Sequence, residues 1–150
     1  MTPTFRAPNE YAFAALLDAL AVPWKYEALE PDISRAIRYQ PDFWLPDSLV
    51  WLEIKPVGHT PTGGETRVAW QLVEAMRSPV YMVAGWPQPV RLAMSAFASG
   101  HPVQTATNKL AMLWLAYALN RRLADVHTAS RAVMSRRMEF VRMWREGRND

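Results

Sequence analysis

Cysteine is absent from this sequence, which excludes disulfide bonds, cysteine-based zinc sites and thiol catalysis. The three histidines, His59, His101 and His127, do not have the spacing of a metal-ligand pair. The longest apolar run, residues 110–119, is much too short to span a bilayer. The first residues also lack the basic and apolar regions of a signal peptide. We therefore expect a soluble, cytoplasmic protein.

Two other catalytic patterns are missing. No arrangement of serine and histidine suggests an acyl-transfer triad, and the Gly63-Gly64 pair lacks the pattern of a phosphate-binding loop. The chain has 150 residues, of which 50% are hydrophobic, and this is enough for one domain with its own core. Seven tryptophans are many for that length, and they predict either heavy packing or a tryptophan-rich surface that binds a partner protein.

Positive charge is concentrated at the C-terminal end of the chain. The formal net charge of +3 is compatible with nucleic-acid binding but does not demonstrate it. Residues 121–150 contain eight arginines and few acids. Because phosphates attract such side chains, we expect DNA contacts from Arg131, Arg136, Arg137 and Arg142. The alternative is a solvated amphipathic helix with ordinary surface charges.

Hydrophobic periodicity and turn residues predict an α/β protein. The expected strands are residues 24–29, 39–46, 49–55, 80–84 and 90–94. The expected helices are residues 10–20 (capped by Asn9), 65–77, 109–120 and 125–145, with loops at residues 30–38 and 56–64. The order αβββαβ, followed by a helical extension, predicts one domain over residues 1–150. Its core would cover about residues 5–94 and its extension about residues 105–147.

The two strands around Pro46-Asp47-Ser48 carry the most informative pattern. If Pro46 pairs with Leu49 across this turn, Asp42 lies opposite Glu53 in an antiparallel hairpin. Side chains alternate along a strand, so Lys55 shares the face of Glu53. The opposite face is wholly apolar and must meet the core, which determines the register. Its residues are Phe43, Leu45, Val50, Leu52 and Ile54.

Two acids facing each other at about 5 Å repel one another unless a cation neutralises them. A hard divalent ion bound by Asp42 and Glu53, Mg²⁺ or Mn²⁺, would do so, and it would polarise a phosphate and help to deprotonate water. Lys55 would then orient that water or neutralise charge on the phosphate. Trp44 and Trp51 share this face nearer the turn, so we expect it to be only partly open to water. The trio suits phosphodiester hydrolysis.

This pattern resembles the PD-(D/E)xK nuclease superfamily in the strings Tyr39-Gln40-Pro41-Asp42-Phe43 and Glu53-Ile54-Lys55. The resemblance implies a restriction-endonuclease-like αβββαβ fold, a mixed sheet flanked by helices, with Asp42 and Glu53 as metal ligands and Lys55 as a catalytic residue. Some members add a glutamate from the first helix, here Glu10, and many carry a glutamine on the helix after the lysine strand, here Gln71. The alternatives are a first-turn glutamate favoured by the helix dipole and, for Gln71, a solvent-facing residue, which we favour there.

The part of the chain from about residue 5 to residue 85 is also similar to small phage-encoded nucleases. Its matching residues are Trp24, Tyr26 and Glu27, followed by the hairpin strings. The resemblance implies a DNA endonuclease in a bacterial or phage-infected cell, and its cofactor would be Mg²⁺ or Mn²⁺.

Duplex cleavage usually needs two active sites, so we expect a homodimer with residues 109–120 as the contact. Two other hypotheses remain open: a non-catalytic DNA- or protein-binding module on the same fold, and an RNA-directed nuclease.

Overall fold

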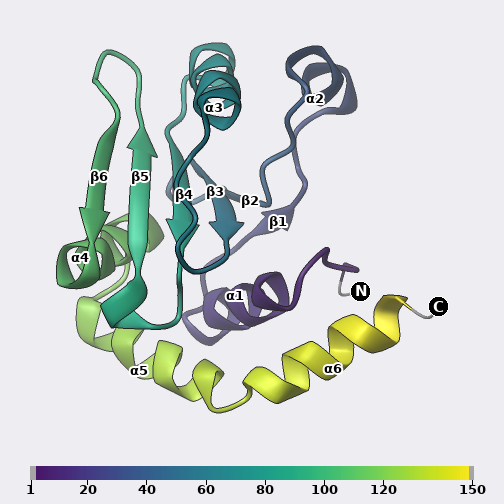
Figure 1. The fold of residues 1–150 in the computed structure, drawn as a ribbon, viewed down its shortest axis with the longest axis vertical. Coiled ribbons are helices and arrows are strands. Elements are labelled where there is room, and N and C mark those ends of the chain that lie inside the picture. The colour runs from purple at the N-terminus through teal and green to yellow at the C-terminus, as the bar shows by residue number, and fades with distance from the viewer. Residues whose placement is uncertain (1–2, 149–150) are drawn as a thin grey trace.

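The computed structural model describes residues 3–148 and has a six-stranded mixed sheet with helices on both faces (Figure 1), so the α/β class is confirmed. The strands are β1 (Lys25–Tyr26), β2 (Phe43–Leu45), β3 (Val50–Lys55), β4 (Val80–Ala84), β5 (Ala93–Phe97) and β6 (Gln104–Thr107). The helices are α1 (Pro8–Ala19), α2 (Pro31–Ile37), α3 (Gly63–Met76), the 3-10 turn η1 (Pro89–Arg91), α4 (Asn108–Leu119), α5 (Leu123–Met134) and α6 (Arg137–Arg148). None of these helices is long and apolar enough to cross a membrane.

The strands follow one another across the sheet in chain order. Neighbouring strands are antiparallel, except that β3 and β4 are parallel and are joined through α3. The hairpin of β2 and β3 has the predicted register, with Phe43 opposite Leu52. A slip of one residue would turn its apolar face away from the core. This register carries Asp42 to the position that faces Glu53, one step beyond the last paired residues.

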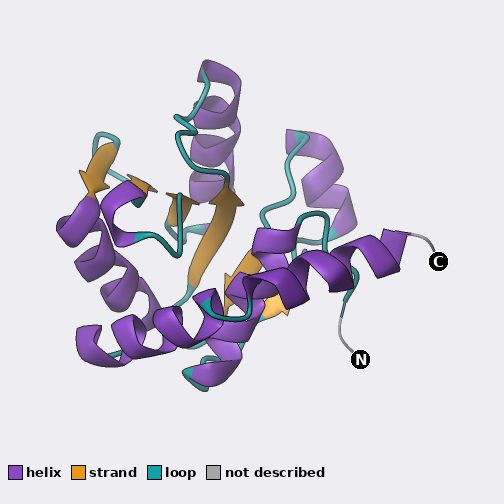
Figure 2. Ribbon diagram, turned by 60° about the horizontal axis from the view of Figure 1, so that its bottom comes forward, coloured by secondary structure: helices purple, strands orange, loops and turns teal. Residues whose placement is uncertain are grey.

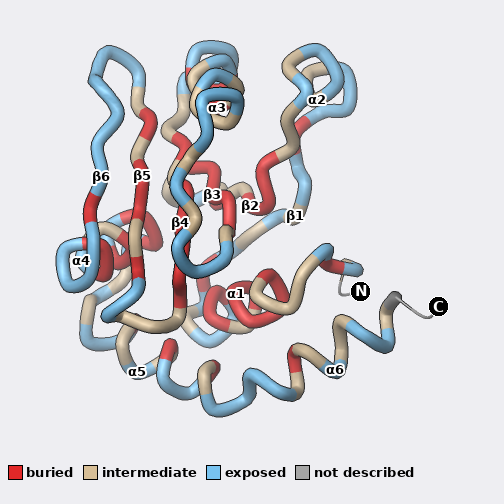
Figure 3. Tube along the Cα trace, viewed as in Figure 1, coloured by how far each residue is buried: buried red, intermediate tan, exposed pale blue. Residues whose placement is uncertain are grey.

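The sheet separates two hydrophobic cores. The larger core lies between the sheet and α1, α4, α5 and α6 and takes in the apolar face of the hairpin. The C-terminal helices run beneath α1 in Figure 1 and come to the front in the turned view of Figure 2. The smaller core lies on the opposite face, under α2 and α3. Buried residues accordingly follow the central strands and α1, while the outer sides of α2 and α3 are exposed (Figure 3).

All seven tryptophans pack into one of these two cores, and none is exposed. Trp51 is 3% exposed because α3 packs over it with Leu72 and Val73, in line with the expectation that the acid-bearing face is only partly open to water. Trp86 contacts Phe13 edge-on, and its indole N–H donates to the hydroxyl of Ser130 at 3.2 Å. Packing therefore accounts for much of the tryptophan content, with two tryptophans buried and five partly buried.

Residues 30–38, expected to be a loop, contain α2, so that prediction is wrong. Pro31 starts the helix with a suitable φ angle, and Asp32 lies in the first turn, where its charge suits the helix dipole. Only Ile33 and Ile37 pack against the smaller core. Two apolar residues one turn apart are too few for periodicity to reveal a helix.

Several boundaries also differ from the prediction. Asn9 is not a cap, because α1 begins at Pro8 with Ala7 in the N-cap position. The strand expected at residues 90–94 begins at Ala93, since the 3-10 turn η1 comes before it. β6 was not predicted, because only Ala106 of this polar strand is buried.

The single helix expected over residues 125–145 is two helices, α5 and α6, which meet at residues 135–136. The break lets Val133 and Phe140 reach the same core while the chain bends around α1. The charges on this segment therefore lie on two helices with different directions (Figure 1).

Candidate active site

The predicted acids meet where β2 and β3 separate. The ladder ends at the Phe43–Leu52 pair, and beyond it the Asp42 carboxylate accepts the backbone N–H of Ile54 at 2.7 Å. A side chain thus replaces the carbonyl that a longer strand would supply. Asp42 is 4% exposed and Glu53 is 8% exposed. The strand geometry therefore holds two buried carboxylates next to each other.

Glu10 joins this pair from the first turn of α1. It is 4% exposed, and it accepts a hydrogen bond from the Tyr26 hydroxyl at 2.8 Å. A solvated first-turn glutamate would be exposed, so the observed environment is the one expected for a member of the site. Tyr26 itself pairs with Phe43 across β1 and β2, which is how the sheet edge reaches α1.

Burial disfavours the charged forms of all three acids, and repulsion from a neighbouring carboxylate adds to this effect for Asp42 and Glu10. Burial, and then the charge of Glu53, raise the pKa of Asp42 to about 7. Burial, and then the charge of Asp42, raise the pKa of Glu10 to about 7. Burial also raises the pKa of Glu53, although Lys55 opposes the effect. The folded protein thus holds protons on these acids at a higher pH than free carboxyl groups would.

One oxygen of this cluster has no hydrogen-bond donor. Oε2 of Glu53 and the hydroxyl of Tyr39 are both buried and have no partner at full hydrogen-bond geometry, although the two side chains interact with each other. An unsatisfied buried polar group costs about 1–3 kcal/mol. A hard divalent cation, which prefers carboxylate oxygens, fits this donor set.

Asp42 and Glu53 are the residues that would hold such an ion. Within residues 3–148, no group of three or more histidine or acidic residues has the arrangement of a complete metal site. Two carboxylates, with water and phosphate in the other positions, are what Mg²⁺ commonly uses.

Lys55 lies at the end of β3, on the same face as Glu53, as predicted. Its Nζ is 3.9 Å from Oε1 of Glu53 and 2.8 Å from Oε2 of Glu65, a residue of α3. Burial alone would lower the pKa of Lys55, but the contacts with these two glutamates outweigh burial and raise it. The lysine is therefore an ammonium ion at neutral pH and a donor beside the acids.

A cleft of about 450 Å³ opens over Glu53 and Lys55. Three exposed arginines, which we call the arginine rim, line it: Arg6, Arg38 and Arg67. The remaining lining residues are Tyr39, Gln40, Gly64, Glu65 and Val68. A concave surface with cations around two acids suits a phosphate group that approaches a metal-binding position.

Arg6 is the arginine closest to the acids. Its guanidinium lies 2.9 Å from Glu27 and 3.8 Å from Asp42. Its backbone carbonyl accepts the indole N–H of Trp144 at 3.0 Å, so α6 holds the N-terminal segment in place. The contact between α6 and the N-terminal segment therefore helps to place Arg6 at the site.

Comparisons with protein-family models, curated proteins and solved structures found no match to this chain. The chemistry of the site must therefore be inferred from its own residues.

Five of the predicted residues lie elsewhere. Gln71 is exposed on α3, as its favoured alternative expected, and does not line the cleft. The predicted DNA-binding residues Arg131, Arg136, Arg137 and Arg142 are on α5 and α6 or between them, and none of them lines the cleft. Arg136 is also engaged, since it pairs with Glu139 at 3.0 Å and lies over the ring of Phe140.

The sequence reasoning missed Glu65, Tyr39 and the arginine rim. Glu65 had a detectable signal, because Thr62 and Glu65 have the spacing of a capping box before an apolar run. Tyr39 had a weaker one, since it belongs to the string that suggested a nuclease. The arginines had none, because Arg6, Arg38 and Arg67 are isolated in the sequence and gather only in the fold.

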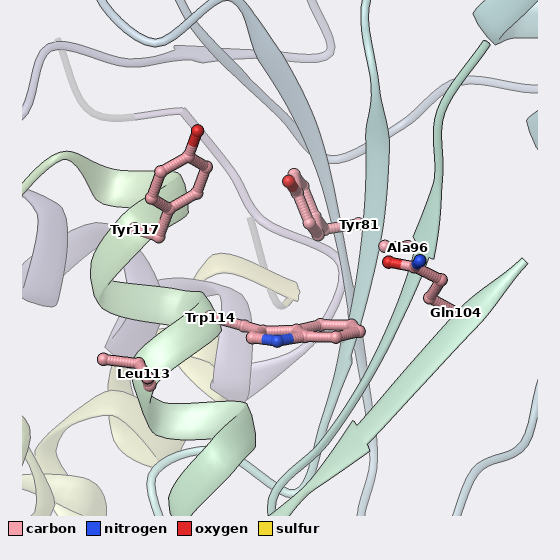
Figure 4. Close-up of a pocket in the computed structure, with 6 residues that line it drawn as sticks. All are labelled: Tyr81, Ala96, Gln104, Leu113, Trp114 and Tyr117. Carbon is pink, nitrogen blue, oxygen red and sulfur yellow. The ribbon is translucent and has the colours of Figure 1, made fainter. Parts of the chain in front are cut away.

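A second cavity, of about 350 Å³, lies between α4 and the sheet (Figure 4). Trp114 and Tyr117 on α4 and Tyr81 on β4 line it, and Gln104 contributes an amide. It contains no carboxylate, lysine or histidine, so it has no group suited to hydrolysis.

Proposed function

We propose that this protein is a metal-dependent DNA endonuclease that hydrolyses phosphodiester bonds. The observation that carries the proposal is the pair of buried, facing carboxylates Asp42 and Glu53, one with an unpartnered oxygen, with the Lys55 ammonium 3.9 Å away. Glu53 and Lys55 line a cleft with an arginine rim, where a phosphodiester would find compensating charge.

The proposal includes a restriction-endonuclease-like fold of the PD-(D/E)xK type. In its favour, a helix precedes an antiparallel hairpin, and the lysine strand is followed by a helix and a parallel strand. The short helix α2, between β1 and β2, is an addition to the expected αβββαβ order.

In this mechanism Asp42 and Glu53 would hold Mg²⁺ or Mn²⁺, and the bound ion would polarise the phosphate and lower the pKa of a water molecule. Lys55 stabilises negative charge that develops on the attacked phosphate, because its ammonium is already held beside Glu53. When deprotonated, Glu10 adds a third negative charge beside Asp42 and so favours cation binding. The arginine rim binds flanking phosphates. One water molecule is added and one P–O ester bond breaks.

The test is cleavage of plasmid DNA and branched junction DNA with Mg²⁺ or Mn²⁺, with structured RNA as a third substrate. We expect the native protein to cut DNA and Lys55→Ala to cut about 10²-fold more slowly or worse, with DNA binding retained. A native protein that binds DNA but cuts nothing with either ion would instead be a binding module. Cleavage of RNA alone would reassign the substrate.

The arginine rim gives a second expected result. Replacing Arg38 and Arg67 together with glutamine removes two phosphate contacts, and each contact contributes about 0.9 to the slope of log affinity against log salt. We therefore expect this slope to fall by about 2 for duplex DNA, measured by fluorescence anisotropy. The matched control replaces the exposed Arg131 and Arg142 with glutamine and should leave the slope unchanged. If the slope instead falls in the Arg131 and Arg142 variant and is unchanged in the Arg38 and Arg67 variant, DNA binding would be assigned to α5 and α6.

A homodimer remains part of the proposal, and α4 is the element we assign to its contact. This helix leaves a stripe of apolar side chains uncovered: Leu110, Leu113 and Tyr117 are 51%, 52% and 82% exposed. The same stripe on a second copy would complement it about a two-fold axis. A monomer in sedimentation experiments, with and without DNA, would remove this part of the proposal.

A further inference from the structure

Glu65 is the strongest partner of Lys55, although nothing in the nuclease-like strings includes it. Its Oε2 is 2.8 Å from Lys55 Nζ, whereas Glu53 is 3.9 Å away. Its other oxygen accepts the backbone N–H of Thr62 at 2.9 Å and faces Nε2 of His59 at 2.8 Å. Both oxygens of one carboxylate are thus occupied, and only one of their three partners belongs to the predicted site.

The backbone holds this carboxylate in place. Thr62 and Glu65 form a capping box, in which the Thr62 hydroxyl accepts the N–H of Glu65 and the Glu65 side chain accepts the N–H of Thr62. Such a box ties a side chain to the first turn of its helix. The Lys55 and Glu65 side chains are each 23% exposed, so this pair is far less solvated than an ordinary surface ion pair. A long, flexible lysine is therefore anchored to a rigid helix end.

We propose that Glu65 is a positioning residue, which uses the capping box at the start of α3 to hold the Lys55 ammonium beside Glu53. The claim that Glu65 supports catalysis rests on the proposed function, because it requires Lys55 to be a catalytic residue. Its structural content, that Glu65 and not Glu53 restrains Lys55, is independent of that function. Without Glu65, the lysine keeps only the more distant Glu53 and moves toward solvent. Misplacing a group by about 1 Å can slow a reaction by about 10²-fold.

Two variants separate positioning from helix capping. Glu65→Gln keeps the capping box, since glutamine also serves at this position, but removes the charge that holds Lys55. Thr62→Val removes the hydroxyl that accepts the Glu65 N–H, but it keeps the Glu65 charge and the Thr62 backbone N–H that holds the Glu65 side chain. Glu65→Gln therefore tests the role of the charge, and Thr62→Val tests the role of the helix cap.

The first measurement is the rate at which an amine-acylating reagent modifies Lys55, read by mass spectrometry in the metal-free protein. Lys25 and Lys109, the other two lysines of the chain and both exposed, are internal standards. We expect Lys55 in Glu65→Gln to react severalfold faster relative to the standards, and Thr62→Val to match the native protein. An unchanged rate in Glu65→Gln would overturn the proposal, whether or not the protein cuts DNA.

The second measurement is steady-state cleavage. We expect Glu65→Gln to lower kcat on the order of 10-fold to 100-fold without changing KM for DNA, while Thr62→Val loses thermal stability but keeps kcat. Equal losses of kcat in both variants would reduce Glu65 to a capping residue and contradict the proposal. If Lys55 reacts faster in Glu65→Gln but the native protein does not cut, the nuclease assignment fails while the anchoring of Lys55 by Glu65 is supported.

Discussion

Replacing Asp42 with asparagine is expected to abolish DNA cleavage and, without divalent cations, to make the protein more stable. Asparagine retains an oxygen for the N–H of Ile54, which Asp42 accepts at 2.7 Å, and adds an amide N–H that can donate to Glu53 or Glu10. It also removes one of two facing buried charges. We expect the cleavage rate to fall by about 10³-fold or more, because a metal ligand is lost.

The gain in stability follows from the same burial. The pKa of Asp42 rises from 3.8 to about 7 in the folded protein. Each unit by which a folded-state pKa is raised is worth about 1.4 kcal/mol at high pH, so Asp42→Asn should increase the free energy of unfolding by about 1–4 kcal/mol at pH 8. Urea unfolding of the native protein and of Asp42→Asn at pH 8, without metal, measures this difference in the free energy of unfolding.

The matched control for this variant is Asp47→Asn, which changes an exposed acid in the turn of the same hairpin. We expect it to leave both cleavage and stability unchanged. An Asp42→Asn protein that still cuts DNA would exclude Asp42 as a metal ligand. One that is less stable than the native protein at pH 8 would show that the buried pair is not under electrostatic strain.

The second large effect is a loss of stability as pH rises, which a divalent cation should reverse. Asp42 and Glu10 have folded-state pKa values of about 7, above their ordinary values of 3.8 and 4.5. A raised carboxyl pKa means that the folded state holds the proton more tightly. The stabilisation from this cluster is therefore complete below about pH 4 and is lost as pH rises through about 7.

Glu65 changes the pH dependence of stability in the opposite direction, but in a different pH range. Its pKa is lowered to about 2; burial opposes this change, but the contacts with Lys55, Thr62 and His59 outweigh burial. Its contribution is present above its ordinary pKa of 4.5 and is lost only as pH falls toward 2. Between pH 5 and pH 8, the acid cluster should therefore dominate the trend.

Thermal or urea unfolding between pH 5 and pH 8, with and without Mn²⁺, measures both effects. We expect stability to fall across this range without metal. Added Mn²⁺ should restore it mainly above pH 7, where the ligands are deprotonated, by about 2.7 kcal/mol at 100 times the Kd. Asp42→Asn should flatten the pH trend and remove the Mn²⁺ effect. A native protein whose stability is independent of pH and of Mn²⁺ would contradict the proposed metal site.

The hairpin could be predicted because strong constraints act over a few residues. Apolar side chains alternate along both strands around a short turn, so only one register buries them. That register brought Asp42 and Glu53 together and put Lys55 on the same face. The buried central strand β4 and the amphipathic helix α3 had equally clear local patterns.

Other elements escaped prediction because their stability comes from distant partners. β6 is nearly all polar, and it is a strand because β5 offers its edge. α2 contributes only two isoleucines to the smaller core. The rest of that core comes mainly from β3, β4 and α3, which are distant in the sequence. The near-complete burial of Trp51 was not predicted, because the position of α3 over that face is a long-range property.

Local pattern alone therefore established the α/β class, the hairpin register and the shared face of two acids and a lysine, because alternation and turn chemistry act between near neighbours. Long-range packing added the burial that raises the pKa of the acids, the contact of Glu10 with them, the anchoring of Lys55 by Glu65 and the arginine rim. These features depend on how separate elements pack against one another, and alternation and turn chemistry within one element do not report such packing.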